Sequence, residues 1–138
     1  MDEVQLQKDA RRAKKWNVII ISIFLVILLL SLVGLGIFKY QHTFTVEKWL
    51  REPNYRTKIV DDLLNRHKLI GMTEGEIISL LGEEESYANT KTSFKISNKK
   101  FEPENTIVYY LGVSYMDDMW LILCLEDGIV TEYYLDVT

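Results

Sequence analysis

The chain begins with a long uninterrupted run of apolar residues. Residues 16–38 contain no charged side chain and are bounded by Lys15 and Lys39. As an α-helix rising about 1.5 Å per residue, this run would span roughly 34 Å, enough to cross a hydrocarbon core of about 30 Å. A soluble core helix normally has a polar face, and the apolar part of a cleaved signal peptide is only about 7–15 residues long. We therefore predict a transmembrane helix over 16–38, with a cleaved signal and a soluble core helix as the alternatives.

Helical periodicity appears in the stretch that follows the apolar run. Within residues 55–67, apolar side chains recur at the spacing of one helix face: Ile59, Val60, Leu63 and Leu64. Pro53 disfavours helix at the residue before it, so the predicted helix begins after this proline. Residues 39–54 are then a connector, whose apolar side chains we expect to lie against the domain as a short strand or a turn of helix.

A second, shorter helix carries both its start and its stop signal. Thr73 stands at the N-cap position with Glu76 three residues later, which is the pattern of a capping box. Gly82 follows the last apolar position and suits a left-handed C-cap. Such a short helix is marginal alone, so the sequence predicts that it packs against another element.

The C-terminal third of the chain has the pattern of an antiparallel sheet. Three runs are rich in β-branched and aromatic residues: 106–112, 119–125 and 129–137. Asp127 and Gly128 separate the last two runs and predict a two-residue hairpin. The run over 119–125 is apolar on both faces and should be central, and residues 94–96 are a candidate for a fourth, edge strand.

Alternation along the last run assigns its two faces. Glu132 and Asp136 share a face with Val130 and Tyr134, which predicts one partly solvated side. The remaining side chains are expected to point to the helices: Ile129, Tyr133, Leu135 and Val137.

These elements predict an α+β protein with one N-terminal transmembrane helix. The helix is followed by a two-layer sandwich of two helices packed on a three- to four-stranded antiparallel sheet. The predicted organisation is a basic cytoplasmic tail at 1–15, the transmembrane helix at 16–38, the connector at 39–54 and an extracytoplasmic domain at 55–138.

The distribution of charge predicts how the transmembrane helix is oriented in the membrane. Five Lys and Arg residues precede the apolar run within residues 1–16, and the positive-inside rule therefore places the N-terminus in the cytoplasm. Residues 39–138 hold 11 Lys and Arg against 17 Asp and Glu, a net charge of −6. An acidic outer domain argues against a nucleic-acid partner, while the basic tail and the apolar run predict contact with the lipid bilayer.

Residues 55–82 and the strands after them resemble the BamE/SmpA-like family, which contains the small lipoprotein subunit of the outer-membrane β-barrel assembly machinery. The resemblance rests on "GMT" at 71–73, the helix with Ile77 and "LLG" at 80–82, and it extends to the fold group of the β-lactamase inhibitory proteins. It implies a small domain that binds other proteins. Two departures stand out: Glu84 replaces the family's usual proline, and no cysteine is placed for N-terminal acylation.

Aromatic and acidic residues of the sheet supply the candidate binding surface. Adjacent tyrosines in a strand put one ring on each face, so the outer rings of Tyr110 and Tyr134 are expected to lie near each other. An acidic hairpin tip is predicted at "YMDDMW", and the candidate partner-binding residues are Tyr110, Tyr134, Tyr115, Asp117, Asp118 and Trp120. A purely structural aromatic ladder is the alternative reading. The acidic pairs are read as solvated turns, with a calcium contact or a basic partner as the alternative.

No residue pattern in the sequence indicates catalysis, a cofactor or a metal. His42 and His67 lack further ligands at metal-binding spacing, and the single cysteine, Cys124, is read as a small buried residue of the central strand. The sequence therefore predicts a single-pass protein of the bacterial cytoplasmic membrane whose outer domain binds a protein partner and assists assembly or regulates that partner. The alternatives are an inhibitor or immunity protein acting on a secreted enzyme or toxin, and an envelope hydrolase that uses the paired carboxylates.

Overall fold

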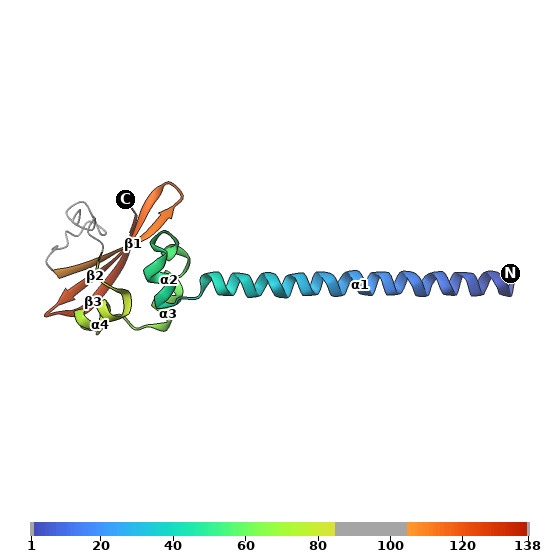
Figure 1. Cartoon of the computed structure of the whole chain (residues 1–138), viewed down its shortest axis with the longest axis horizontal. Coiled ribbons are helices and arrows are strands. Elements are labelled where there is room, and N and C mark those ends of the chain that lie inside the picture. The colour runs from blue at the N-terminus through green and yellow to red at the C-terminus, as the bar shows by residue number, and fades with distance from the viewer. Residues whose placement is uncertain (1, 85–104, 138) are drawn as a thin grey trace. The chain divides into compact units, whose positions relative to one another are not determined.

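The computed structural model describes residues 2–84 and 105–137 of the chain (Figure 1). It divides into two compact units, residues 1–40 and 41–138. The elements follow in the order α1 (Glu3–His42), α2 (Val46–Arg51), the 3-10 helix η1 (Pro53–Lys58), α3 (Val60–Arg66), α4 (Glu74–Leu81), β1 (Thr106–Ser114), β2 (Asp117–Glu126) and β3 (Ile129–Val137). The fold is therefore α+β, as the sequence predicts.

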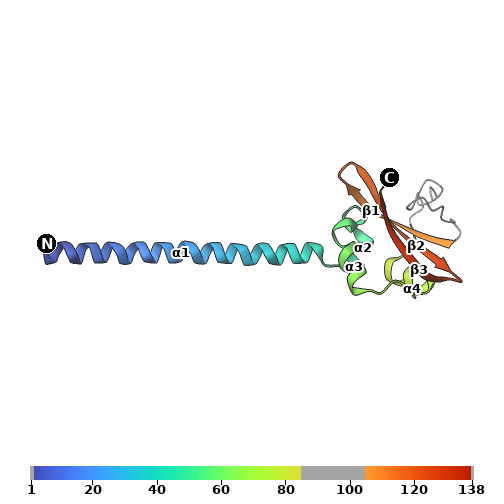
Figure 2. The same cartoon turned by 180° about the vertical axis from the view of Figure 1, so that it is seen from behind.

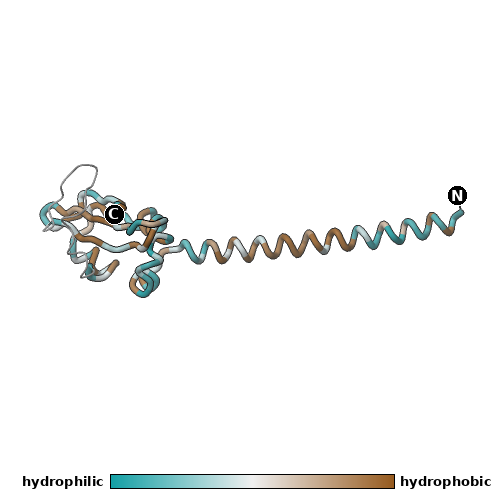
Figure 3. Tube along the Cα trace, turned by 90° about the horizontal axis from the view of Figure 1, so that it is seen from above, coloured by the Kyte–Doolittle hydropathy of each residue, from teal (hydrophilic) through white to brown (hydrophobic). Residues whose placement is uncertain are grey.

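The N-terminal unit is the helix α1, which runs without a break through the basic tail and the apolar run. None of its residues is buried. Figure 3 shows the apolar run as a brown stretch within α1, with hydrophilic residues toward the N-terminus. By length and composition, α1 is able to cross a membrane, and a signal sequence would meet the same two criteria.

The C-terminal unit begins at Gln41, so it includes most of the predicted connector at 39–54, although residues 39–42 still belong to α1. Thr45 caps α2 by accepting a hydrogen bond from the Lys48 N–H, and Trp49 of α2 is completely buried. The connector therefore contributes a turn of helix and two core residues, Phe44 and Trp49, to the domain.

The helix predicted over 55–67 is divided into two pieces. Pro53 begins the 3-10 helix η1, and Ile59 ends it and also precedes α3. The carboxylate of Asp62 in α3 accepts hydrogen bonds from the Phe44 N–H at 2.7 Å and from Arg66 Nε at 2.9 Å. The backbone hydrogen bond, helped by Arg66, holds the pKa of Asp62 below its ordinary value.

The capping box of α4 is confirmed. Thr73 Oγ1 accepts from the Glu76 N–H at 3.3 Å, and the Glu76 carboxylate accepts from the Thr73 N–H at 2.8 Å. The bond from the Thr73 N–H, together with one that the Thr73 hydroxyl donates to the same carboxylate, lowers the pKa of Glu76. Gly82 ends the helix with a positive φ of 82°, although its ψ of 178° is extended rather than left-handed helical.

The sheet has the strand order β1-β2-β3, and both connections are antiparallel hairpins. Asp127 and Gly128 both have positive φ, as a type I′ turn requires, so the predicted hairpin is confirmed. The central position of β2 is confirmed too, because its Trp120–Leu123 stretch is buried on both faces. The predicted edge strand at 94–96 lies outside the described residues.

A bulge near the start of β3 overturns part of the predicted face assignment. Leu125 pairs with Val130 and Cys124 pairs with Glu132, which leaves Thr131 as an extra residue in β3. Val130 therefore lies in the main core with the helices instead of sharing a face with Glu132, and Ile129 pairs with Glu126 and is 42% exposed. Beyond the bulge the alternation follows the prediction.

Two hydrophobic clusters occupy opposite faces of the sheet. The larger one joins buried residues of α2, α3 and α4 to residues of all three strands, such as Trp49, Leu63, Ile77, Tyr109 and Leu121. The smaller one contains Val108, Trp120 and Ile122, with Tyr110, Cys124 and Tyr134 packed against it. Three short helical segments, η1, α3 and α4, stand where two helices were predicted, and α2 lies in the predicted connector. The arrangement of the helices as one layer remains a prediction.

The 3-10 helix η1 approaches strand β1 very closely at Gly112. A Cβ atom built on Gly112 would lie 2.4 Å from the carbonyl oxygen of Asn54. Gly112 also has a φ of 115° and sits beside a bulge where the β1–β2 register shifts. Glycine is therefore required at this position both for the backbone conformation and for the space.

Replacing Gly112 with alanine should lower the free energy of unfolding by about 3 kcal/mol or more, because the new methyl group meets backbone rather than a movable side chain. Urea unfolding of the detergent-solubilised chain, followed by tryptophan fluorescence, measures the change. Gly75→Ala is the matched control: it lies in α4 with nothing within 4 Å of the new Cβ and should raise stability by no more than about 1 kcal/mol. Equal effects of both substitutions would contradict the close approach.

Candidate protein-binding surface

The face of the sheet that carries the smaller cluster is rich in aromatic side chains. Tyr110 and Trp120 are cross-strand partners, and their rings meet edge to face with centroids 5.1 Å apart. Tyr134 pairs with Ile122 on the other side of β2 and packs against the same cluster. Trp120 is only 7% exposed, while Tyr110 and Tyr134 are half-buried. These three residues therefore pack within the smaller cluster, and Tyr110 and Tyr134 also remain partly exposed at its surface.

Both tyrosine hydroxyl groups on this face donate a hydrogen bond to a carboxylate. Tyr110 donates to Asp118 Oδ1 at 3.0 Å, and Tyr134 donates to Glu132 Oε2 at 2.5 Å. The hydrogen bond to the Glu132 carboxylate, together with burial, raises the pKa of Tyr134. Each ring is thereby fixed in one direction, with an acidic group at its polar end.

Among the described residues of the C-terminal unit, the turn between β1 and β2 is the most exposed apolar feature. Ser114 pairs with Asp117, so Tyr115 and Met116 are the two turn residues. Their side chains are 102% and 95% exposed, and Val113 beside them is 58% exposed. The last β2–β3 pair is Met119 with Val137, so the turn extends beyond the end of β3, as Figures 1 and 2 show. We call residues 113–118 the hairpin tip.

Tyr115 holds an unfavourable backbone conformation in this tip. Its φ is +61°, whereas Met116 is not among the residues with positive φ. A two-residue turn with positive φ at its first position only has the φ pattern of type II′, where glycine is preferred. A large side chain at this position costs backbone energy and gains no burial, which is the pattern expected of a residue that serves recognition rather than stability.

The six residues predicted to bind a partner thus fall into two groups. Tyr115, Asp117 and Asp118 lie in the exposed hairpin tip, and Tyr110, Trp120 and Tyr134 lie on the sheet face. The Tyr110–Asp118 hydrogen bond connects the groups. Tyr110 and Tyr134 share a face, as predicted, but β2 lies between their strands.

Sequence reasoning missed Val113 and Met116 as exposed apolar residues of the tip. The signal for Met116 was present, because a hairpin tip predicted at "YMDDMW" must expose the residues of its turn. Val113 carried no such signal, since valine in a β-run is usually counted toward the core.

Histidine and cysteine occupy ordinary structural positions. His67 ends α3, as predicted, and its ring meets Phe44 edge to face at 5.3 Å. Cys124 is half-buried on the aromatic face rather than fully buried. Across residues 2–84 and 105–137 there is no group of three or more His, Cys, Asp or Glu that could hold a metal ion.

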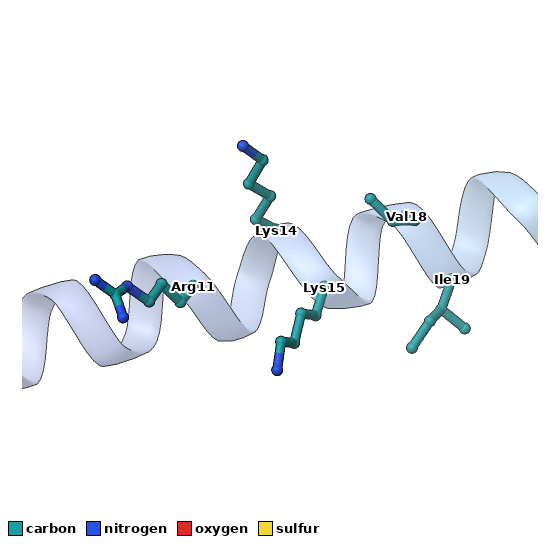
Figure 4. Close-up of a pocket in the computed structure, with 5 residues that line it drawn as sticks. All are labelled: Arg11, Lys14, Lys15, Val18 and Ile19. Carbon is teal, nitrogen blue, oxygen red and sulfur yellow. The ribbon is translucent and has the colours of Figure 1, made fainter.

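The boundary between basic and apolar residues in α1 is the other surface of note. Figure 4 shows Lys14 and Lys15 one turn before Val18 and Ile19 and Arg11 a further turn away, with the cationic side chains spreading to different sides of the helix. Long cationic side chains next to an apolar helix suit the headgroup region of a bilayer.

Comparisons with known protein families, with curated proteins and with solved structures each give no match for this chain.

Replacing Tyr115 with glycine should raise the free energy of unfolding by about 1 kcal/mol, because glycine adopts the positive φ without strain and the exposed ring contributes no burial. Urea unfolding measures this change. Met116→Gly is the matched control in the same turn; it relieves no positive φ and should leave stability unchanged or lower it by up to about 1 kcal/mol. A loss of stability in Tyr115→Gly would show that the ring has a structural role.

Proposed function

We propose that this chain is a single-pass membrane-anchored protein of the bacterial cell envelope whose outer domain binds a protein partner, and thereby assists assembly or regulates that partner. The observation that carries the proposal is the hairpin tip. Tyr115 and Met116 are almost fully exposed at its end, and the neighbouring Asp117 and Asp118 are exposed too.

The chemistry of the tip suits recognition of a protein. Aromatic side chains and methionine are enriched at the centres of protein interfaces, where they fill pockets on the partner. The two-residue turn already fixes the backbone of Tyr115, so little backbone entropy is lost when its ring binds. The carboxylates beside it favour a partner with a basic rim around an apolar pocket.

Anchoring by α1 supports the same function. A helix that retains its apolar run after export would hold the domain at the membrane surface with the N-terminus in the cytoplasm, because the cationic residues lie before the run. Tethering raises the effective concentration of the domain for a partner that resides in the same membrane.

An inhibitor or immunity protein is the second candidate. The same protruding tip, with two exposed apolar side chains in its turn, has a shape that could enter the cleft of a secreted enzyme or toxin. This candidate requires one tightly bound soluble target rather than a resident envelope protein.

Replacing Tyr115 and Met116 together with serine should reduce capture of the partner by about tenfold or more, because two apolar anchors are lost. Quantitative mass spectrometry of proteins co-purified with the full-length tagged chain from solubilised membranes measures this. Asp118→Ala and Tyr134→Phe should weaken capture less, through loss of the carboxylate and of the hydroxyl.

Ile70→Ser is the matched control, since Ile70 is an exposed apolar residue of a different loop, 44% exposed. If the tip and control variants capture the same proteins in the same amounts, the tip is not the binding surface. Recovery of a single secreted enzyme in equal amount to the chain would favour the inhibitor.

A further inference from the structure

The two outer edges of the sheet differ in what covers them. On β1, the Val108 N–H donates to Glu84 Oε2 at 3.0 Å, and the Tyr110 carbonyl accepts from Arg56 Nη1 at 2.9 Å. On β3, residues 71–74 cover only the beginning of the edge. No hydrogen bond from another described element reaches the edge of β3 beyond Val130.

The covered part of the β3 edge already forms hydrogen bonds with main chain from outside the sheet. The Gly71 N–H donates to the Val130 carbonyl at 2.7 Å, the Val130 N–H donates to the Met72 carbonyl at 2.8 Å, and Thr73 forms a bridge with Ile129. The chain itself thus shows that main chain can pair with this edge. The pairing stops where β3 continues from Glu132 to Val137.

The register identifies which backbone groups face outward along the open part. Val108 and Tyr110 direct their backbone groups away from β2. Backbone direction alternates along a strand, so Ile107 and Tyr109 direct their backbone groups toward β2. Their partners in β2, Leu123 and Leu121, therefore direct their backbone groups toward β1. The residues that pair with Leu123 and Leu121 on the other side, Tyr133 and Leu135, must therefore direct their N–H and C=O groups to the open edge. Within the described parts of the chain these groups have no hydrogen-bond partner.

The side chains along this edge alternate in character. Tyr133, Leu135 and Val137 are 37%, 38% and 49% exposed on the face that bears the main core. Glu132 and Asp136 lie on the opposite face, flanking Tyr134. An added strand would place its side chains about 4.5–5.5 Å from these residues. On one face its side chains would lie beside apolar residues, and on the other face they would lie beside the two carboxylates.

We propose that the open edge of β3, from Glu132 to Val137, binds an extended segment of a partner protein by strand addition, and that this segment alternates apolar with basic residues. The main-chain groups of Tyr133 and Leu135 supply the hydrogen bonds, and the alternation supplies the specificity. A second copy of β3 does not fit, because it would bring further Glu132 and Asp136 carboxylates onto the same face of the sheet, between domains that each carry a net charge of −6. This surface is independent of the hairpin tip.

Amide hydrogen exchange on the full-length chain in phosphatidylcholine nanodiscs tests the proposal directly. The probes are two capped peptides, one of alternating lysine and valine and one of alternating glutamate and valine. The lysine peptide should slow exchange at Tyr133 and Leu135 by about tenfold or more, and the glutamate peptide should leave both amides unchanged. Equal protection by both peptides, or no protection of these amides, would overturn the proposal.

Leu135→Pro removes the Leu135 N–H, which points to the open edge, without removing a hydrogen bond to β2. The lysine peptide should then no longer protect the Tyr133 amide from exchange, while the amides of β2 stay protected. Leu135→Thr keeps the donor and should still bind. If the proline variant fails to fold, Glu132→Lys combined with Asp136→Lys replaces it and should transfer the preference to the glutamate peptide.

The Tyr115 and Met116 serine variant should bind the lysine peptide normally, which separates this surface from the tip. Protection of Tyr133 and Leu135 that rises with chain concentration in the absence of peptide would show that a second copy occupies the edge, contrary to the proposal.

Discussion

The hydrogen bonds of the buried Arg56 guanidinium group are the interaction on which the C-terminal unit depends. Its side chain is 3% exposed; Nε donates to the Trp49 carbonyl at 2.8 Å, and Nη1 donates to the Tyr110 carbonyl at 2.9 Å. The same group lies 4.7 Å from the centre of the Trp49 ring. Arginine remains protonated even when buried, so its donors must be satisfied inside the domain. Arg56 thus ties α2, η1 and β1 together at one point.

Trp49 and Gly112 complete this junction. The Trp49 ring meets Phe44 and Tyr109 edge to face at 6.0 and 5.8 Å, and its indole N–H has no hydrogen-bond partner among the described residues. The packing of the ring therefore outweighs one unmade hydrogen bond. Gly112 lets the Asn54 carbonyl lie against β1. Beyond the contact of Gly112 with Asn54, the hairpin tip extends past the end of β3. The contacts of Arg56 and Asn54 with β1 also cover the edge of that strand.

The two proposed surfaces follow from this asymmetry. The helical segment η1 engages the edge of β1, whereas no other described element forms a hydrogen bond to the edge of β3 beyond Val130. The tip offers apolar side chains and the β3 edge offers main-chain groups, so the two surfaces recognise a partner by different chemistry. Both carry carboxylates beside apolar residues, and both would therefore select basic partners.

Local signals in the sequence predicted most of the secondary structure. The capping box of Thr73 and Glu76, the Asp127-Gly128 hairpin and the central strand each depend on neighbours in the sequence, and all three are confirmed. The bulge at Thr131 was not predictable, because it has no glycine and changes the face of Val130 only through pairing with β2. Arg56 likewise reads as an exposed charge in the sequence, since its acceptors are backbone carbonyls.

For the candidate surface, too, the features that depend on local pattern were predictable and those that depend on strand order were not. Tyr115, Asp117 and Asp118 were placed correctly in a hairpin tip because turn position follows from local pattern. Burial of Trp120 and the open edge of β3 depend on strand order and on what covers each strand, which local pattern does not contain.

The most direct test of the account is photo-crosslinking in the native cell, with a photoreactive amino acid at position 115, an affinity tag at the N-terminus and purification from the membrane fraction. Recovery through this tag requires that α1 remain attached to the outer domain. Position 115 should capture one extracytoplasmic protein that the exposed α4 position Ser79 does not capture. The same captured proteins from both positions, or loss of the N-terminal tag from the crosslinked product, would contradict it.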